Sequence, residues 1–257
     1  MHSPAGASSF DAADFFDPKS FSRRAYRQYV QGKRCRNRRN LHVKTNSVRL
    51  PFGYPLVELD VGEFATLRAN GMKFSIQAFK AQGLGHVSIM RAKGFFGLMK
   101  MDTLMIVPDE KDLPLYSYDR IYAAGNDTLI VELYDTLTAP LDLGALGEII
   151  SRRTYLAGRD PGKHWYDDIK LEESISKKGK RAQTPELDAL AYEHFEAYLS
   201  APAAATADVS QKKARSAAYV NGLLTHGGPS TDVFKKALGA ETTSRLFCEV
   251  LFGIDGK

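Results

Sequence analysis

The sequence predicts an α+β fold in which one antiparallel sheet is covered by helices. Six strand-like segments follow one another between residues 56 and 134, and no helix long enough for a parallel crossover separates them. Apart from a short helix expected at Phe21–Gln31, helical periodicity is confined to the residues after 140. Strands first and helices afterwards are typical of this class. We expect a flexible tail over residues 1–18 and one domain over residues 19–257.

The centre of the predicted sheet is the stretch from Met101 to Thr138. It contains three strand-like segments, at Leu104–Val107, Tyr116–Ala123 and Thr128–Tyr134. Alternating residues bounded by turn residues indicate an antiparallel meander. Asp119 lies in the middle of the second segment, although Asp is a poor strand former and is costly to bury. The pattern therefore marks Asp119 as a candidate functional residue.

Three further strands precede this stretch, at Leu56–Val61, Lys73–Phe79 and Val87–Arg91, because large and polar residues alternate in each. A turn is expected at Gly94–Gly97, which contains Phe95 and Phe96. Adjacent exposed phenylalanines are unusual, so we expect both rings to be buried under a neighbouring element.

Helices are predicted in the second half of the chain, at Leu141–Arg152, Thr184–Ser200 and Ser210–Thr225, and again from Ser230 or Thr231 onward. The second begins with Thr and Pro, which suit a helix start. The KKGKR sequence at Lys177–Arg181 is predicted to be an exposed basic loop.

The composition indicates a soluble intracellular protein and excludes several classes. Mean hydropathy is −0.30, and no run approaches the ~20 apolar residues of a membrane helix. The N-terminus has no apolar core, so it is not a secretory signal. Cys35 and Cys248 have no metal-ligand spacing, which favours a reduced compartment. Phosphate-binding glycine loops, HExxH and GxSxG are absent from the sequence.

The net charge of +5 is unevenly distributed. The segment from Lys19 to Val57 holds eleven Lys or Arg residues and no Asp or Glu. Such a segment fits nucleic acid, an acidic protein partner, or a solvated basic arm without a partner.

Several segments, in order, resemble the ferredoxin-dependent bilin reductases. One family segment consists of a strand, a Pro, a loop, a Leu-Pro pair, aromatic residues and an Asp. It resembles Val107-Pro108 followed by LPLYSYD at Leu113–Asp119. Leu129–Thr138 resembles its next strand and closing turn, and Lys163-His164-Trp165 lies where the family has Pro-x-Trp. The C-terminal sequences KALG at Lys236–Gly239 and VLF at Val250–Phe252 resemble the family's last helices. The resemblance spans residues 87–252, and red chlorophyll catabolite reductase is a related possibility.

This resemblance implies an α/β/α sandwich with an open-chain tetrapyrrole between the sheet and the C-terminal helices. It also implies that no metal, flavin or nicotinamide is bound. Electrons would come singly from reduced ferredoxin, and side chains would supply protons. A donating carboxyl group must then hold a proton near neutral pH, which burial favours. The family's proton-donating Asp falls on Asp119; the alternative is that Asp119 pairs with Arg120 or a neighbouring strand.

The sequence departs from the family at other positions. Thr103 stands where some members have a His, and Ser88 or a neighbour stands where some have a Glu; both are retained as substrate-binding candidates. These absences argue against a four-electron reduction. Asp102 is a further catalytic candidate if the register differs by one residue.

The family's acid before the helix-breaking Pro is replaced by Gly228-Pro229, so the second donor is open. Glu196 is our candidate, and the other acids considered are Asp188, Asp208 and Asp232. His194 and His226 are expected to be surface or packing residues. The resemblance gives Arg152 and Arg153 as possible propionate ligands and Tyr219 as a binding residue; a solvated face explains the two arginines equally well.

The sequence thus predicts a cytoplasmic or plastid-stromal monomer that reduces biliverdin or a dihydrobiliverdin in two-electron steps through a bilin radical. The alternatives are a reductase of a chlorophyll-derived bilin and a non-enzymatic protein that binds a tetrapyrrole or nucleic acid. A membrane partner is not expected.

An acidic ferredoxin would be attracted by the basic segment, so we expect turnover to fall as salt is raised to about 0.3 M, where screening is strong. Steady-state rates with reduced ferredoxin measure this. Rates that stay flat over that range would contradict docking through the basic segment.

Overall fold

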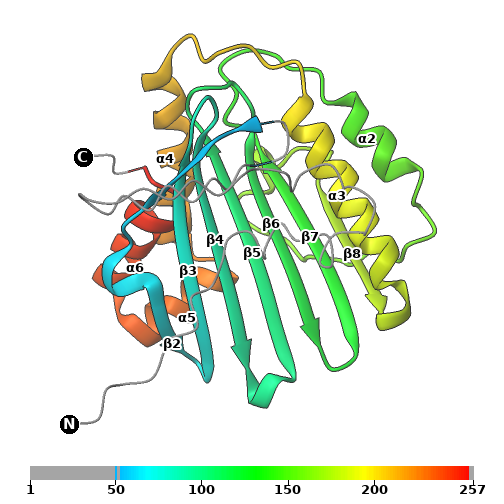
Figure 1. Ribbon diagram of the computed structural model, residues 1–257, viewed down its shortest axis with the longest axis vertical. Coiled ribbons are helices and arrows are strands. Elements are labelled where there is room, and N and C mark those ends of the chain that lie inside the picture. Colours follow the sequence, from blue (N-terminus) through cyan, green and yellow to red (C-terminus); the bar gives the residue numbers. More distant parts are fainter. Residues whose placement is uncertain (1–49, 51–52, 255–257) are drawn as a thin grey trace, which may run out of the picture.

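The computed structural model describes residue 50 and residues 53–254, which form an eight-stranded sheet with helices on both faces (Figure 1). The strand order is β1-β3-β4-β5-β6-β7-β8, every pairing is antiparallel, and β2 also pairs with β3. The strands are β1 (Leu56–Leu59), β2 (Thr66–Ala69), β3 (Met72–Ala81), β4 (Gly85–Gly94), β5 (Met99–Pro108), β6 (Leu115–Ala123), β7 (Asn126–Tyr134) and β8 (Ile175–Lys180). The predicted α+β class and antiparallel sheet are confirmed.

The helices divide between the two faces. They are α2 (Gly144–Ser151), α3 (Thr184–Ser200), α4 (Val209–His226), α5 (Pro229–Leu238), α6 (Ala240–Arg245) and the π-helical η7 (Leu246–Leu251). We call the face that packs on α2 and α3 the α3 face, and the face that packs on α4 to η7 the C-terminal face. Helix α3 covers β7 and β8, whereas η7 covers β3 and β4, so the two layers lie over opposite edges of the sheet (Figure 1).

Each face has its own apolar core, because alternate residues of a strand point to opposite faces. On β6, Tyr116 and Tyr118 enter the core with α3, while Leu115 enters the core with the C-terminal helices. This alternation extends through β4, β5 and β7 and fixes which side chains can meet above each face.

The six predicted strands are all present, and the predicted second helix has the bounds of α3. Two strands were not predicted. β2 is only four residues long. β8 includes most of the KKGKR sequence that we expected to be a loop; it is an edge strand on β7, and lysines are common on edge strands because they discourage further pairing. The last predicted helix is divided at Gly239, whose φ of 81° ends α5.

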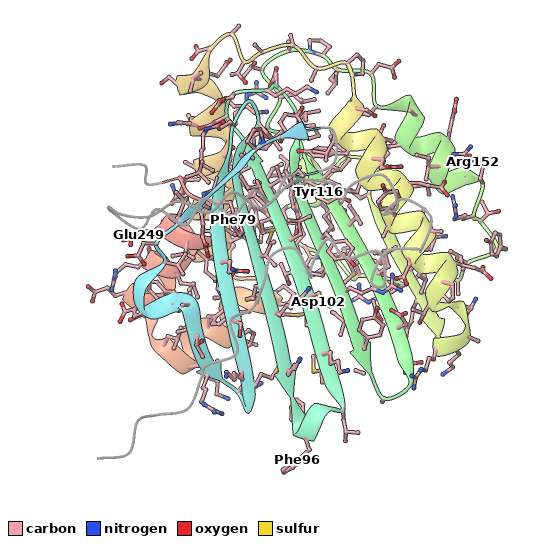
Figure 2. All side chains as sticks on the ribbon, in the orientation of Figure 1. Phe79, Phe96, Asp102, Tyr116, Arg152 and Glu249 are labelled. Atoms are coloured by element: carbon pink, nitrogen blue, oxygen red, sulfur yellow. The ribbon has the colours of Figure 1, made fainter. Side chains whose placement is uncertain are left out.

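The prediction that Phe95 and Phe96 are buried is wrong. They form the tip of the β4–β5 hairpin, which projects beyond the reach of the helices on either face, and Phe96 points outward in Figure 2. The basic segment Lys19–Val57, the short helix expected within it and the predicted tail lie almost wholly outside the described residues. Among the described helices, none combines the length and apolar character needed to cross a membrane.

A buried ion pair connects α4 to the sheet. The Lys212 ammonium is fully buried, and its Nζ lies 3.0 Å from Asp112 Oδ1. The other Asp112 oxygen accepts hydrogen bonds from the backbone N–H of Ala139 and from the hydroxyl of Thr138. Burial lowers the pKa of Lys212, so the charged form depends on this carboxylate.

Replacing Lys212 with Ala should therefore lower the free energy of unfolding by about 3–5 kcal/mol, because Asp112 would keep a buried charge without its cation. The matched change Lys213→Ala removes an exposed neighbour that only approaches Asp109 at 3.8 Å, and it should cost at most about 1 kcal/mol. Urea unfolding of both variants measures the difference. Equal losses would contradict the role of the buried pair.

Candidate active site

The central strands form a partly open floor on the C-terminal face. Register places three rows of neighbouring side chains there: Met105, Ser117 and Glu132; Thr103, Asp119 and Ile130; Met101, Ile121 and Thr128. The apolar members Met101, Met105, Ile121 and Ile130 remain partly exposed. The C-terminal helices therefore bury the β3–β4 half of this face but leave these floor residues partly accessible.

Asp119 is at the centre of this floor. Its Oδ1 accepts a hydrogen bond of 2.5 Å from the hydroxyl of Thr103, its cross-strand neighbour. Burial raises the pKa of Asp119 to about 6; the nearby Glu132 charge acts in the same direction, and the Thr103 hydrogen bond opposes it. A carboxyl group with such a pKa can hold and release a proton near neutral pH.

Arg120 does not neutralise Asp119, because adjacent residues on β6 point to opposite faces. The Arg120 guanidinium lies on the α3 face, where its Nε is 2.5 Å from Asp127 Oδ1 and its Nη2 is 3.0 Å from Asp188 Oδ1. Within the described residues, Asp119 forms no ion pair. The alternative that Asp119 pairs with Arg120 is therefore wrong, whereas a polar contact with the neighbouring strand is present in the hydrogen bond from Thr103 on β5.

Glu132 is a second acid on the same floor that the sequence analysis missed. It lies one row from Asp119 on the adjacent strand, a diagonal separation of roughly 7–8 Å between Cα atoms. The hydroxyl of Tyr134 donates a hydrogen bond of 2.6 Å to its Oε2. The signal that marked Asp119, an acid in the middle of an apolar strand, applies equally to Glu132.

Aromatic rings border the floor at its Glu132 end. Tyr134 and Tyr219 have ring centroids 4.1 Å apart, and Tyr166 meets Tyr134 edge-on at 5.5 Å. The imidazole of His164 stacks on Tyr166 at 4.8 Å. Burial raises the pKa of Tyr166 and of Tyr219, and the charges of Glu132 and Asp119 add to both shifts. The rings and the two acids therefore share one electrostatic environment.

Trp165 joins this aromatic group to α4. Its Nε1 donates to the carbonyl of Gly227 at 3.0 Å, and its ring lies against Gly222. A Cβ at position 222 would come within 2.2 Å of the ring, so glycine is needed here for close packing. The predicted Lys163-His164-Trp165 motif thus brings His164 and Trp165 to the wall of the floor.

The structure brings together three of the candidate residues and places a fourth, Ser88, on the same face away from them. Asp119, Thr103 and Tyr219 line the floor or its wall, and Ser88 lies on the same face. Ser88 is buried and donates its hydroxyl to the carbonyl of Leu251 at 2.7 Å, so it fixes η7 to the sheet rather than facing the floor.

The catalytic candidates Asp102 and Glu196 are on the α3 face, with the sheet between them and Asp119. Asp102 points away from the floor by strand alternation, and its Oδ1 lies 3.4 Å from Arg91. Glu196 is on α3, where it accepts a hydrogen bond from Tyr192. Neither is placed to serve the Asp119 floor, so the expectation that they act with Asp119 is corrected.

Arg152 and Arg153 are also far from the floor. They follow α2 on the α3 face, and Arg152 points outward at the edge of the molecule (Figure 2). Arg153 Nη2 lies 2.5 Å from Glu193 Oε1, and Arg152 approaches the same carboxylate at 3.9 Å. The expectation that they bind propionates beside Asp119 is therefore corrected.

The remaining alternatives have other roles. Asp188 pairs with Arg120, and Asp208 caps α4 by accepting from the backbone of Gln211. His194 is buried in α3 and bonds the carbonyl of Glu173, while Asp232 is exposed on α5. Among the described residues, no group of three or more His, Cys, Asp or Glu side chains is arranged to bind a metal ion.

Comparison with solved structures identifies the fold. Phytochromobilin synthase from tomato, solved in complex with biliverdin, matches with a TM-score of 0.61 and 13% sequence identity. The match covers 78% of this chain and 78% of the synthase. No family model and no curated protein sequence matches. The chain thus shares the fold of a ferredoxin-dependent bilin reductase, as the sequence resemblance predicted.

The raised pKa of Asp119 has a consequence for stability. Its folded pKa of about 6 exceeds that of an unfolded Asp, so stability is lost as pH rises through the interval from about 4 to 6 and stays low above it. Asp119→Asn removes this loss. We expect the variant to be more stable than the parent by up to about 3 kcal/mol at pH 7.5, and by only about 1 kcal/mol at pH 4.5.

Urea unfolding at the two pH values measures this difference. The exposed Asp168→Asn change is the matched control, and its effect should be small at both pH values. An Asp119→Asn effect that is the same at pH 4.5 and 7.5 would contradict the assigned pKa.

Proposed function

We propose that this protein reduces a linear tetrapyrrole of the biliverdin type, with Asp119 as a proton donor and reduced ferredoxin as the source of electrons. The observation that carries this proposal is the Asp119 carboxyl group. It lies at the centre of a partly open apolar floor, and its pKa is about 6. The shared fold with a biliverdin-bound synthase supports the choice of substrate class.

The floor suits a planar conjugated molecule. Methionine side chains and Ile130 provide apolar contact beneath it, and the aromatic wall of Tyr134, Tyr166 and Tyr219 provides stacking surface at one end. A bound tetrapyrrole would exclude water from the floor. The pKa of Asp119 would then rise further, because desolvation disfavours the carboxylate.

The reaction balances as two electrons and two protons added to one carbon–carbon double bond. Two ferredoxins are each oxidised by one electron, the π bond is lost, and two bonds to hydrogen form. Asp119 supplies one proton, and solvent then protonates the Asp119 carboxylate again. We propose Glu132 as the source of the second proton, in place of Glu196, because only Glu132 shares the floor with Asp119.

Thr103 and Tyr134 position the two acids. The Thr103 hydroxyl holds one Asp119 oxygen, which leaves the other oxygen available to carry the proton. Tyr134 holds Oε2 of Glu132, whose Oε1 lies 4.0 Å from the Lys170 ammonium, and the Tyr134 ring contacts Tyr219 on α4. Helix α4 thereby fixes the wall and the second acid together.

Three acid-to-amide variants test these roles against biliverdin and reduced ferredoxin under anaerobic conditions. Asp119→Asn should retain pigment binding and lose turnover by 100-fold or more, within the range for loss of a general acid. Glu132→Gln should slow turnover at least 10-fold and accumulate a radical absorption band, because the second protonation is delayed. Glu196→Gln is the matched control on the α3 face and should be unaffected.

Full activity in Asp119→Asn would remove that residue from the mechanism. A loss in Glu196→Gln as large as that in Glu132→Gln would reject Glu132 as the specific second donor. If the unchanged protein binds biliverdin without turnover, the substrate is a different bilin or the protein is a carrier. Absence of pigment binding would reject the proposal.

A further inference from the structure

The tip of the β4–β5 hairpin exposes an apolar surface that neither core of the described residues uses. Phe95 and Leu98 expose 53% and 75% of their surfaces, and Phe96 is exposed in full. In Figure 2 the Phe96 ring points away from the body of the protein. Large apolar side chains grouped in this way on a convex tip indicate an interaction surface.

The backbone of the tip adds a second observation. Phe95 and Phe96 have φ values of 51° and 55°, in the left-handed region. This region is uncommon for bulky residues, and hairpin turns that require it usually hold Gly, Asn or Asp. The two rings therefore occupy positions where the fold alone would favour other residues.

Basic side chains form a row directly behind the tip. Arg68, Lys73, Lys93 and Lys100 are cross-strand neighbours on β2, β3, β4 and β5, and all four are exposed. None of them forms an ion pair within the described residues. Lys180 ends β8 at the same end of the sheet and is also exposed. The nearest acid of β5, Asp102, is engaged by Arg91.

We propose that this hairpin tip binds the surface of an anionic lipid bilayer, a partner that the sequence analysis did not expect. The aromatic rings would enter the interface between headgroups and acyl chains, where Phe and Leu side chains of peripheral proteins are inserted. The basic row would lie at the depth of the headgroups, where each Lys or Arg is attracted by anionic lipids. Because the described helices do not cross a membrane, this contact is peripheral.

A lipid surface fits this geometry better than a protein partner. The apolar residues form a convex tip, whereas protein interfaces bury apolar anchors in pockets of matching shape, so a partner would need a deep socket. A bilayer accepts a tip of any outline. The basic residues lie only on the side of the tip that faces the sheet. This arrangement is expected when the tip itself points into an acyl layer.

Sedimentation with vesicles tests the proposal on the full chain. One set of vesicles is phosphatidylcholine alone and the other contains phosphatidylserine as well. The unchanged protein should bind the second set and bind the first at least 10-fold more weakly. Phe95→Asn with Phe96→Asn should weaken binding to the anionic vesicles 10-fold or more; Asn tolerates positive φ, so the hairpin should remain folded.

Lys93→Gln with Lys100→Gln tests the basic row and should weaken binding about 5-fold for each charge removed. Tyr155→Asn and Lys236→Gln are the matched controls, because they change an exposed ring and an exposed lysine elsewhere and should bind as the unchanged protein does. The N-terminal basic segment is intact in every variant. Equal binding by the Phe95 and Phe96 variant would show that this segment alone binds the vesicles and would overturn the proposal.

A second measurement reports the tip directly. Phe96→Trp should show fluorescence quenching by brominated acyl chains beyond the background from Trp165 in the unchanged protein. Absence of added quenching would overturn insertion. If vesicles are not bound but the Phe95 and Phe96 variant loses turnover with reduced ferredoxin, the tip serves the acidic protein partner and the lipid proposal is rejected.

Discussion

The alternation of side chains along β6 determines the arrangement of the site. Tyr116, Tyr118 and Arg120 point to the α3 face, and Leu115, Ser117 and Asp119 point to the C-terminal face. A shift of one residue in register would exchange the two sets, placing an arginine on the floor and an acid among the residues packed under α3. The buried hydrogen bonds and ion pairs on the two faces hold this register. Each of them joins polar groups on one face, so a shift by one residue would break it.

Arg120 and Asp119, at the centre of β6, have different electrostatic environments because they lie on opposite faces of the sheet. Arg120 is almost completely buried, and Asp127 and Asp188 compensate its charge at hydrogen-bonding distance. Asp119 receives one hydrogen bond from a neutral hydroxyl, and burial raises its pKa to about 6. The α3 face therefore retains a charge by pairing it. The C-terminal face instead raises the pKa of Asp119, which shifts this residue toward the neutral acid, the form that can donate a proton.

Sequence reasoning found the features that depend on local pattern. Each predicted strand is present in the structure, because strand geometry directly produces the alternation from which it was predicted. Helix α3 begins at the predicted Thr-Pro start. Asp119 was found because an acid within an apolar strand is costly wherever the strand lies. The same reasoning, applied to Glu132, would have found the second acid of the floor.

Features that depend on which face is covered could not be found in this way. Glu196 is a polar residue on α3, and Arg152 and Arg153 directly follow α2. Only the assembled sandwich shows that these two helices pack on the α3 face. Phe95 and Phe96 appeared to be core residues because average burial statistics describe the typical environment of Phe. Their exposure follows from hairpin length, because the tip extends past the helices that cover the rest of β4.

A sequence identity of 13% with a solved structure of the same fold is consistent with these physical requirements. The sandwich needs alternation, volume and two covered faces, which many residue combinations provide. The proposed chemistry needs more specific conditions: an acid at the centre of the floor, a neutral hydrogen-bond donor beside it, and a partly open surface above it. Asp119 and Thr103 meet the first two conditions, and the offset of the helices toward β3 and β4 meets the third. Under the proposed function, the substrate completes the desolvation that the helices leave unfinished, so occupancy of the floor and retention of the Asp119 proton are thermodynamically linked.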